Sequence, residues 1–324
     1  MRLLPTVMLG IGLTLAGAAI AQTTPAYPSK PLKIIVPISP GSATDILVRT
    51  VAERMQARLG VPVIIENRAG AGTTIGAAVV AKSDPDGYTI LSNSAAHTVN
   101  SFLYRNLPYD SATDFTGVTP LANLPNILVV SPQSPLNSVQ ELVAAARKAP
   151  GKLNYASAGM GSGTHMNAEK FRIAAGIVAE HIAFKGTPEA VTETMTGRID
   201  WFFAPGVSVL NQIREKKLRA LAMGSKERLS QLPDLPTTEE AGVPNSAYNF
   251  WVGLFVPAKT PAAIVAKLNQ EVVAALQTPE VKERYAKLGA EPMPMSVEAF
   301  RAYLAQEFKV TEQIVKAAGI KPQD

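Results

Sequence analysis

Apolar residues along this chain fall into short runs that alternate with helical stripes. After a proline-rich segment at 25–31, the run at 32–38 has the length and composition of a buried parallel strand. Between Asp45 and Leu59 the apolar residues recur at helical spacing instead, and Gly60 ends that stretch. Further strand, loop and helix signals follow in the order 61–66, 67–72, 73–82 and 88–92. This order predicts an α/β unit built on parallel strands.

The same alternation restarts in the second half of the chain. Strands are expected at 127–130, 153–156, 181–184 and 199–203, with helices at 139–148, after 164 to about 175, and after 188 to 197. One more apolar run at 250–256 precedes a mainly helical tail from 261. The pattern therefore predicts a second α/β lobe.

The first 21 residues have the pattern of a secretory signal peptide. Arg2 is followed by no charged residue up to position 20, and Ala19-Ile20-Ala21 has the small-x-small form of a cleavage site. A membrane anchor is the alternative, since about 18 apolar residues can just span a bilayer. Pro5, the glycines and the cleavage site favour the signal peptide, so we expect a periplasmic protein that begins at Gln22.

Composition excludes several classes of function. The chain has no cysteine and three histidines, which are widely separated, so it offers no thiol nucleophile and no metal-ligand spacing. We expect neither a metal nor a cofactor. The formal charge of +5 falls to +4 without the leader, which carries one arginine, and no basic block indicates nucleic-acid binding.

Four loops share one design, because each leaves an expected strand and enters an expected helix. Backbone N–H groups at such helix starts favour an anion, and ligands of parallel sheets lie beyond the carboxyl ends of the strands. His97 is expected in a further loop that faces the same cleft. The candidate ligand-binding residues in the four loops are Ser39, Gly41, Ser42, Ala43, Thr44, Asp45, Gly72, Thr73, Thr74, Ser157, Gly161, Ser162, Gly163, Thr164, His165, Lys185, Gly186 and Thr187.

Nucleotide-binding and catalytic motifs are weak. The stretch 159–163 reads G-x-G-x-G, without the Lys-Ser/Thr of a P-loop or the spacing of a dinucleotide fingerprint. Ser162 lacks a G-x-S-x-G elbow. A hydrolase or isomerase that uses His165 or Asp45 stays an alternative, as does an interaction module that docks on a sensor without any small molecule.

Motifs along nearly the whole mature chain resemble those of the tripartite tricarboxylate transporter receptors, also called Bug proteins. The order and spacing of these motifs carry the resemblance more than any single one. They are Tyr27-Pro28-Ser29-Lys30-Pro31-Leu32-Lys33-Ile34-Ile35-Val36-Pro37, Pro40-Gly41-Ser42-Ala43-Thr44-Asp45, Glu66-Asn67-Arg68-Ala69-Gly70-Ala71-Gly72, Leu107-Pro108-Tyr109-Asp110, Asp114-Phe115, Gly161-Ser162-Gly163-Thr164-His165-Met166, Lys185-Gly186, Leu232-Pro233-Asp234-Leu235-Pro236-Thr237 and Gly253-Leu254-Phe255-Val256-Pro257.

The resemblance implies a type II periplasmic binding-protein fold, in which two α/β lobes joined by two crossover strands close on a ligand. The crossover strands would be 127–130 and 250–256, which gives lobe 1 as 27–126 with 251–324 and lobe 2 as 127–250. It also implies a receptor rather than an enzyme. Such a receptor holds a small carboxylate through loop amides and ordered waters. The expected partners are the membrane subunits of a tripartite tricarboxylate-type transporter or a sensor protein, and the expected state is a monomer.

Three departures from the family pattern bear on the ligand. Ser42 and Ala43 stand in a loop that is usually richer in glycine. Phe184 stands where the family commonly has tyrosine, and Ala204 stands where it commonly has an acidic residue. Both residues are expected in the wall of the ligand-binding site. Fewer polar groups on that wall predict a ligand with an apolar or aromatic body.

Overall fold

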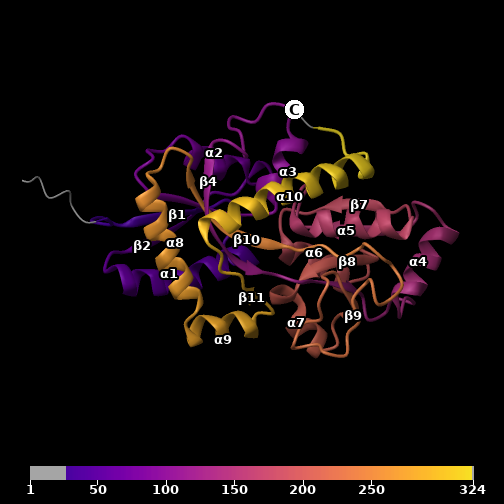
Figure 1. The fold of residues 1–324 in the computed structure, drawn as a ribbon. Helices are drawn as coiled ribbons and strands as arrows, with labels where there is room; N and C mark the ends of the chain where they lie inside the picture. Colours follow the sequence, from indigo (N-terminus) through magenta and orange to yellow (C-terminus); the bar gives the residue numbers. More distant parts are fainter. Residues whose placement is uncertain (1–26, 323–324) are drawn as a thin grey trace, which may run out of the picture.

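The computed structural model describes residues 27–322, so the expected signal peptide at 1–21 lies outside the described residues. The described chain forms two β-sheets, each flanked by helices, and the two α/β lobes lie side by side (Figure 1). This is the two-lobed α/β architecture that the sequence predicts. Within 27–322, no helix is both long and apolar enough to cross a membrane.

The first sheet has six strands in the order β11-β4-β10-β3-β1-β2. They span Leu32–Val36 (β1), Val63–Asn67 (β2), Thr89–Ser94 (β3), Phe115–Asn123 (β4), Trp251–Pro257 (β10) and Glu291–Pro292 (β11). Strands β1, β2 and β3 run parallel, as predicted, whereas β10 runs antiparallel to both β3 and β4. The helices of this lobe are Ala43–Leu59 (α1), Thr74–Ala81 (α2), Ala96–Leu103 (α3), Ala262–Leu276 (α8), Pro279–Lys287 (α9) and Val297–Ala318 (α10), with a short 3-10 turn at Ala71–Thr73.

The second sheet has five strands in the order β7-β6-β8-β5-β9. They span Asn126–Val130 (β5), Asn154–Ser157 (β6), Glu180–Ala183 (β7), Trp201–Pro205 (β8) and Arg219–Met223 (β9), and the helices are Val139–Lys148 (α4), Gly163–Ala175 (α5), Thr187–Met195 (α6) and Gly206–Arg214 (α7).

The strand β8 is buried on both faces of its sheet. Trp201 and Phe203 pack with α4 and α5 in one apolar cluster, while Phe202 and Ala204 pack with α6 and α7 in another. Because successive side chains of a strand point to opposite faces, this continuous apolar run is what a sheet covered on both sides requires.

Two short segments connect the lobes and run side by side. Strand β4 ends at Asn123 and β5 begins at Asn126, so only Leu124 and Pro125 separate the sheets at the first crossing. The Leu124 N–H donates a hydrogen bond to the Phe250 carbonyl, 2.7 Å away, at the second crossing. The two segments expected to cross between the lobes, 127–130 and 250–256, correspond to β5 and β10. Each of these strands belongs to one sheet only and begins directly after a crossing point.

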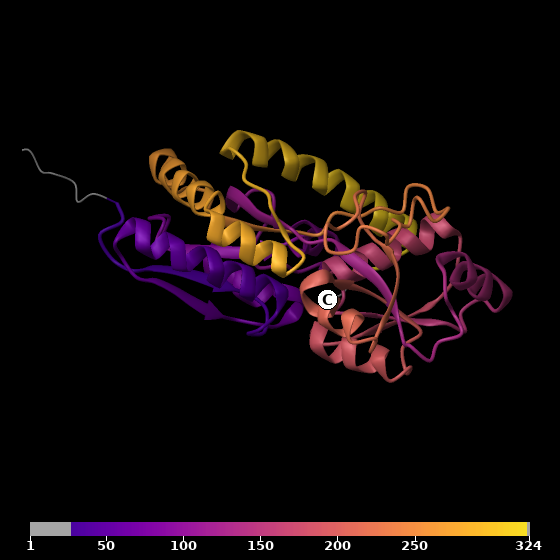
Figure 2. The same ribbon diagram turned by 90° about the horizontal axis from the view of Figure 1, so that it is seen from below.

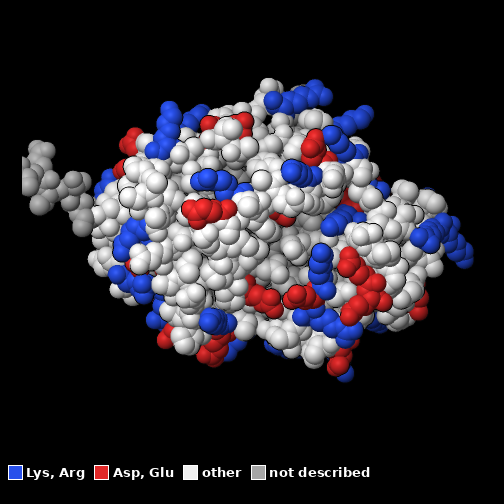
Figure 3. Space-filling model, in the orientation of Figure 1, with Lys and Arg blue, Asp and Glu red and all other residues white. Residues whose placement is uncertain are grey.

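Charge is spread without a block of one sign on the face seen in Figure 3, where basic and acidic side chains intermingle over both lobes. Seen from below, the same arrangement of two lobes is clear in Figure 2.

Candidate functional site

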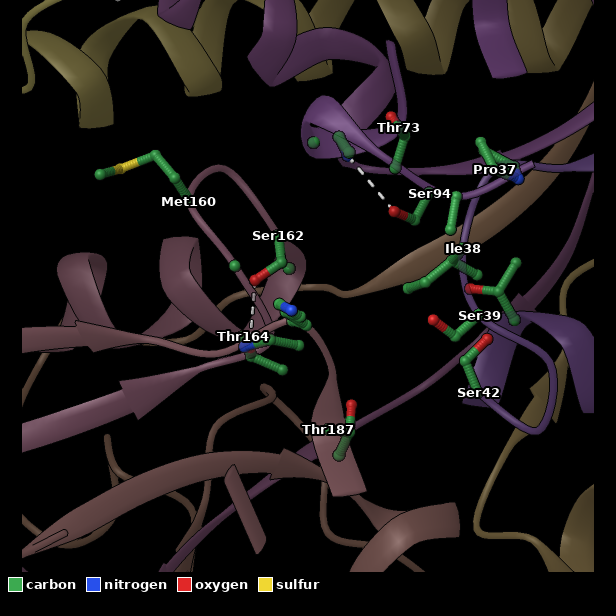
Figure 4. Close-up of a pocket in the computed structure, with 18 of the residues that line it drawn as sticks. Pro37, Ile38, Ser39, Ser42, Thr73, Ser94, Met160, Ser162, Thr164 and Thr187 are labelled. Carbon is green, nitrogen blue, oxygen red and sulfur yellow. Dashed lines mark hydrogen bonds between the residues drawn. The ribbon is translucent and has the colours of Figure 1, made fainter. Parts of the chain in front are cut away.

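A cavity of about 470 Å³ lies between the lobes, where the carboxyl ends of the parallel strands meet (Figure 4). Ser39 and Ser42 face it from the first lobe, whereas Ser162 and Thr164 face it from the second. Twelve of the candidate residues line this cavity: Ser39, Ser42, Ala43, Thr44, Gly72, Thr73, Ser162, Gly163, Thr164, Phe184, Lys185 and Thr187.

The remaining candidates are not among the lining residues: Gly41, Asp45, Thr74, His97, Ser157, Gly161, His165, Gly186 and Ala204. Most of them support the loops from behind. Ala204 is fully buried in the core on one face of its sheet, so its side chain belongs to the packing of the lobe.

His97 requires a correction. It lies in helix α3 rather than in a loop, it is 2% exposed, and its ring stacks on Phe255 with centroids 4.1 Å apart. Burial lowers its pKa to about 4, so the imidazole is a neutral core residue. No local pattern around His97 indicates this stacking, because Phe255 is distant along the chain.

Several lining residues escaped prediction. Ser94 ends β3, Ala96 begins α3 and Tyr104 directly follows α3, while Phe250 comes from the second crossing segment. Ile38, Met160 and Pro205 add apolar surface next to the predicted loops. Ser94 could have been found as the last residue of a strand that turns into a helix, but the sequence pattern does not predict helix α3.

The two lobes present the same local motif to the cavity, Gly-Ser-x-Thr at the start of a helix. Ser42 caps α1 and Ser162 caps α5, with φ/ψ of −67°/161° and −64°/158°. Each is preceded by a glycine with positive φ, 77° at Gly41 and 74° at Gly161. Such a conformation is easy for glycine and strained for other residues.

Hydrogen bonds within the two motifs also correspond. In each, the serine Oγ accepts from the backbone N–H three residues later, at 3.3 Å in both. The side chain at that position accepts in return from the glycine N–H: Asp45 Oδ2 at 2.9 Å from Gly41, and His165 Nδ1 at 3.2 Å from Gly161. These reciprocal caps fix the loops, and the residues that carry the first helical N–H groups, Ala43 and Thr44 in α1 and Gly163 and Thr164 in α5, line the cavity.

Asp45 is buried but well compensated. Burial opposes its ionisation, yet hydrogen bonds from Arg49, the Gly41 N–H and Asn67 together hold its pKa below the usual range. The carboxylate thus serves as an acceptor inside the first lobe and does not line the cavity.

His165 is held neutral in the corresponding place of the second lobe. Its ring stacks on His181 at 4.1 Å, and burial, with smaller effects of His181 and Arg172, lowers its pKa to about 3. His181 in turn hydrogen bonds Ser157 Oγ at 2.7 Å. Both histidines therefore support the loop 157–165 instead of acting as bases, since a neutral Nδ1 must accept from Gly161.

Hydroxyl groups around the cavity are arranged as donors. Ser94 Oγ accepts from the Ala96 N–H (Figure 4), and Thr73 Oγ1 accepts from the Asn100 side chain at 3.1 Å. Thr164 Oγ1 accepts from the Ala158 N–H at 2.9 Å, and it also shares a hydrogen bond of 2.9 Å with Ser162 Oγ (Figure 4), so this pair has one hydroxyl hydrogen left. A hydroxyl oxygen that already accepts has its hydrogen left to donate. Among the described residues that line the cavity, none is acidic and Lys185 is the one cation.

Comparisons with known proteins agree with this geometry. Residues 47–320 match the family model described as tripartite tricarboxylate transporter family receptor. The chain is 34% identical to Protein BugT of Bordetella pertussis over 97% of both chains. It is also 38% identical to a protein encoded in the tcbD-tcbE intergenic region of Pseudomonas sp. strain P51, over 85% of this chain and 84% of that one.

Solved structures share the fold along nearly the whole chain. Rpa4515 of R. palustris, solved with adipate, is 32% identical with a TM-score of 0.87, covering 92% of this chain and 100% of that one. MatC of Rhodopseudomonas palustris, solved with bound malate, is 31% identical with a TM-score of 0.82, covering 89% of this chain and 100% of that one.

Proposed function

Since this chain belongs to the family of tripartite tricarboxylate transporter receptors, we propose that it captures a small organic acid in the periplasm and delivers it to the membrane subunits of a transporter of that class. It is a receptor and not an enzyme. The periplasmic location rests on the expected signal peptide together with the family.

The observation that carries the proposal is the excess of donors around the cavity. Helices α1 and α5 begin at its two sides, and their free N–H groups add to the hydroxyl hydrogens of Thr73 and Ser94. Donors and helix N-termini stabilise a carboxylate, whereas a cationic ligand would find no acidic group among the lining residues that the structure describes. The adipate and malate of two structural relatives are carboxylates of this kind.

Apolar residues form the rest of the wall and define the body of the ligand. Tyr104, Met160, Phe184 and Phe250 come from four separate segments and line the same cavity. We infer that the acid has an apolar or aromatic body, which such side chains would remove from water at about 25 cal/mol per Å². The cavity volume of about 470 Å³ accommodates a ring or a medium-length chain together with water.

A wider set of residues and the lobe boundaries form part of the same proposal. The twelve lining candidates are assigned to ligand contact, while Gly41, Asp45, Gly161 and His165 hold the loops. The lobes are proposed as 27–126 with 251–324 and as 127–250, which the assignment of strands to the two sheets supports. A monomer is proposed, because each lobe must move freely relative to the other.

A thermal-shift screen of the mature protein over organic acids tests the proposal. Binding to the native state alone stabilises it by RT ln(1 + [L]/Kd), about 2.7 kcal/mol at a hundredfold excess over Kd. The panel should contain malate, adipate, aspartate, glutamate and aromatic mono- and dicarboxylates, with uncharged methyl esters as controls. A rise in Tm for acids but not for their esters is expected, and the absence of any response would contradict the receptor function.

The transporter partnership needs a separate measurement. Membrane vesicles that contain the membrane subunits of a tripartite tricarboxylate-type transporter should take up the labelled acid only when this protein is added. Uptake that is independent of the protein, with binding intact, would contradict that partnership while leaving the capture of the acid in place.

A further inference from the structure

The turn at 70–73 has a backbone conformation that its sequence does not favour. Four consecutive residues have positive φ angles: Gly70 at 137°, Ala71 at 42°, Gly72 at 59° and Thr73 at 82°. Glycine adopts this region readily, whereas the Cβ atoms of Ala71 and Thr73 disfavour it. All four residues line the cavity between the lobes. A strained turn at such a place persists only where the surrounding groups hold it.

Asn100 of α3 holds this turn from behind. Its Nδ2 donates to the Gly72 carbonyl at 2.9 Å and to Thr73 Oγ1 at 3.1 Å. Asn93 Nδ2 adds a longer hydrogen bond to Thr73 Oγ1 at 3.4 Å. Asn100 is fully buried and is not among the described residues that line the cavity. Its amide group therefore acts on the turn and not directly on a ligand.

The other end of the Asn100 amide does not contribute to stability. Asn100 Oδ1 is buried, and within residues 27–322 it has no hydrogen-bond partner. Val99 and Leu103, on the same helix, are buried and apolar. Because an unpaired buried oxygen is unfavourable, the packing of α3 alone does not explain an asparagine at this position. What the amide provides is its hydrogen bonds to the turn.

The second lobe packs against the same part of α3. A Cβ added to Gly161 would lie 2.4 Å from Leu103 Cδ1 and 3.7 Å from Asn100 Oδ1. Gly161 belongs to the loop that leads into α5, and Ser162 of this loop and Thr73 of the turn both line the cavity (Figure 4). Helix α3 is thus confined between the turn and the second-lobe loop, which fixes the place of Asn100 relative to both.

We propose that Asn100 is a positioning residue that holds the turn at 70–73 in its left-handed form. Without its hydrogen bonds, Ala71 and Thr73 return to negative φ angles, which L-residues prefer. The Thr73 hydroxyl and the Gly72 backbone then move on the cavity wall. The consequence for affinity rests on the proposed capture of an acid, whereas the conformation of the turn is a property of the ligand-free protein.

Asn100→Leu and Asn100→Asp remove the donated hydrogen bonds in different ways. Leucine suits a helix and carries no unpaired oxygen, so this variant is expected to fold. Aspartate keeps the shape of the side chain, but its carboxylate has no N–H to donate. Each variant should bind the acid with the largest response in the screen about tenfold more weakly, the effect of one or two lost hydrogen bonds. Wild-type affinity in Asn100→Leu, measured by isothermal titration, would overturn the proposal.

Asn269 provides the matched control in the same lobe. Its Nδ2 also donates to two acceptors, the carbonyls of Val118 and Met295, both at 2.8 Å. It lies outside the set of lining residues that the structure describes. Asn269→Leu and Asn269→Asp should lose stability and keep the affinity of the wild type. If they bind as weakly as the Asn100 variants, general loosening of the lobe explains the effect and the proposal is wrong.

Ala71→Gly separates the turn from general support of the fold. Glycine has no Cβ to disfavour a positive φ, so the turn needs less help from Asn100 when residue 71 is glycine. Ala71→Gly should therefore raise affinity in the Asn100→Leu background by about threefold more than it does in the wild type. Equal effects in the two backgrounds would contradict the proposed role.

Hydrogen exchange reports on the turn without any ligand. The Thr73 N–H donates to the Gly70 carbonyl at 3.0 Å and closes the turn. In ligand-free Asn100→Leu this amide should exchange about tenfold faster than in the wild type, while the Gly60 amide at the end of α1 keeps its rate. An unchanged rate at Thr73 overturns the proposal even where acid binding is confirmed. If no acid binds the wild type, the proposed function fails, and the exchange rate still decides the role of Asn100.

Discussion

Gly163 lies so close to Phe250 that a Cβ added to it would be 2.2 Å from the Phe250 Cδ2. Gly163 is the first residue of α5, and Phe250 belongs to the second crossing segment, so the contact joins the second lobe to the hinge. Both residues line the cavity. The absence of a side chain at Gly163 therefore lets the hinge pass directly over the start of α5.

Gly163→Ala should disturb the cavity and the hinge together. Inserting a methyl group into such a contact typically costs about 1–3 kcal/mol, so we expect a lower Tm and weaker binding of the acid. Gly163→Ala combined with Phe250→Ala should recover part of the affinity, because the smaller side chain relieves the overlap. Gly186→Ala is the control, since a Cβ there meets only Pro188 Cδ at an ordinary 3.6 Å. Equal affinity in Gly163→Ala and wild type would contradict this account.

Local signals explain which elements the sequence could predict. Helix α4 is predicted at 139–148 and is found at Val139–Lys148, because the apolar spacing that predicts it lies within the segment itself. The parallel strands were likewise found within a few residues of their predicted positions. The sequence pattern predicts loops at the starts of α1 and α5. It does not predict that both loops form the same reciprocal cap, which the φ angles and hydrogen bonds show.

Long-range contacts explain what could not be predicted. Strand β4 contains Gly117 and Pro120, which suggest a loop, but Gly117 is required because a Cβ there would lie 2.7 Å from Phe300 Cδ1. In α3, Asn100 is buried where an apolar residue would be expected, and its side chain bonds the Gly72 carbonyl at 2.9 Å. Because α3 was missed, Ser94, Ala96 and Tyr104 were missed as cavity residues.

Removing either cap serine should weaken acid binding. Ser42→Ala and Ser162→Ala each lose a helix cap, at a cost of about 1 kcal/mol in stability, and each removes a hydroxyl from the cavity wall, which in the second lobe is the one that shares a hydrogen bond with Thr164 Oγ1. Loss of a hydrogen bond to a charged group corresponds to about a tenfold decrease in affinity. Isothermal titration with the best acid of the screen measures this effect.

The control for the cap serines is Ser138→Ala. Ser138 caps α4 by accepting from the Glu141 N–H at 3.1 Å and is not among the lining residues. It should lose similar stability with unchanged affinity. If all three variants bind alike, the proposed role of the paired motifs in holding the anion is wrong.

Buried histidines should make the protein less stable in acid. The pKa values of His97 and His181 are lowered to about 4, against 6.5 for the free group. Between these values the unfolded chain binds protons that the native state does not, so stability is complete above about pH 6.5 and falls as the pH decreases toward 4. Each such histidine should lower the free energy of unfolding by about 2 kcal/mol when the pH falls from 7 to 5.

Urea unfolding of wild type and His97→Phe at the two pH values checks this prediction. Phenylalanine cannot take up a proton and can keep the packing against Phe255 and Phe115, so the variant should lose less stability between pH 7 and pH 5. The same loss in both proteins would show that His97 does not titrate as its burial requires.

Phe184 should determine how polar the body of the ligand can be. It lines the cavity on the second lobe, where its ring offers no hydrogen bond. Phe184→Tyr adds a hydroxyl to that wall, so the ratio of affinities for malate over an unsubstituted aromatic acid should rise about fivefold, the value of one neutral hydrogen bond. Phe184→Leu is the matched control, because it keeps the wall apolar and should leave that ratio close to wild type. Titration of both acids against the three proteins decides the matter: a ratio that moves equally in the tyrosine and leucine variants would mean that ring shape, and not the missing hydroxyl, sets the preference.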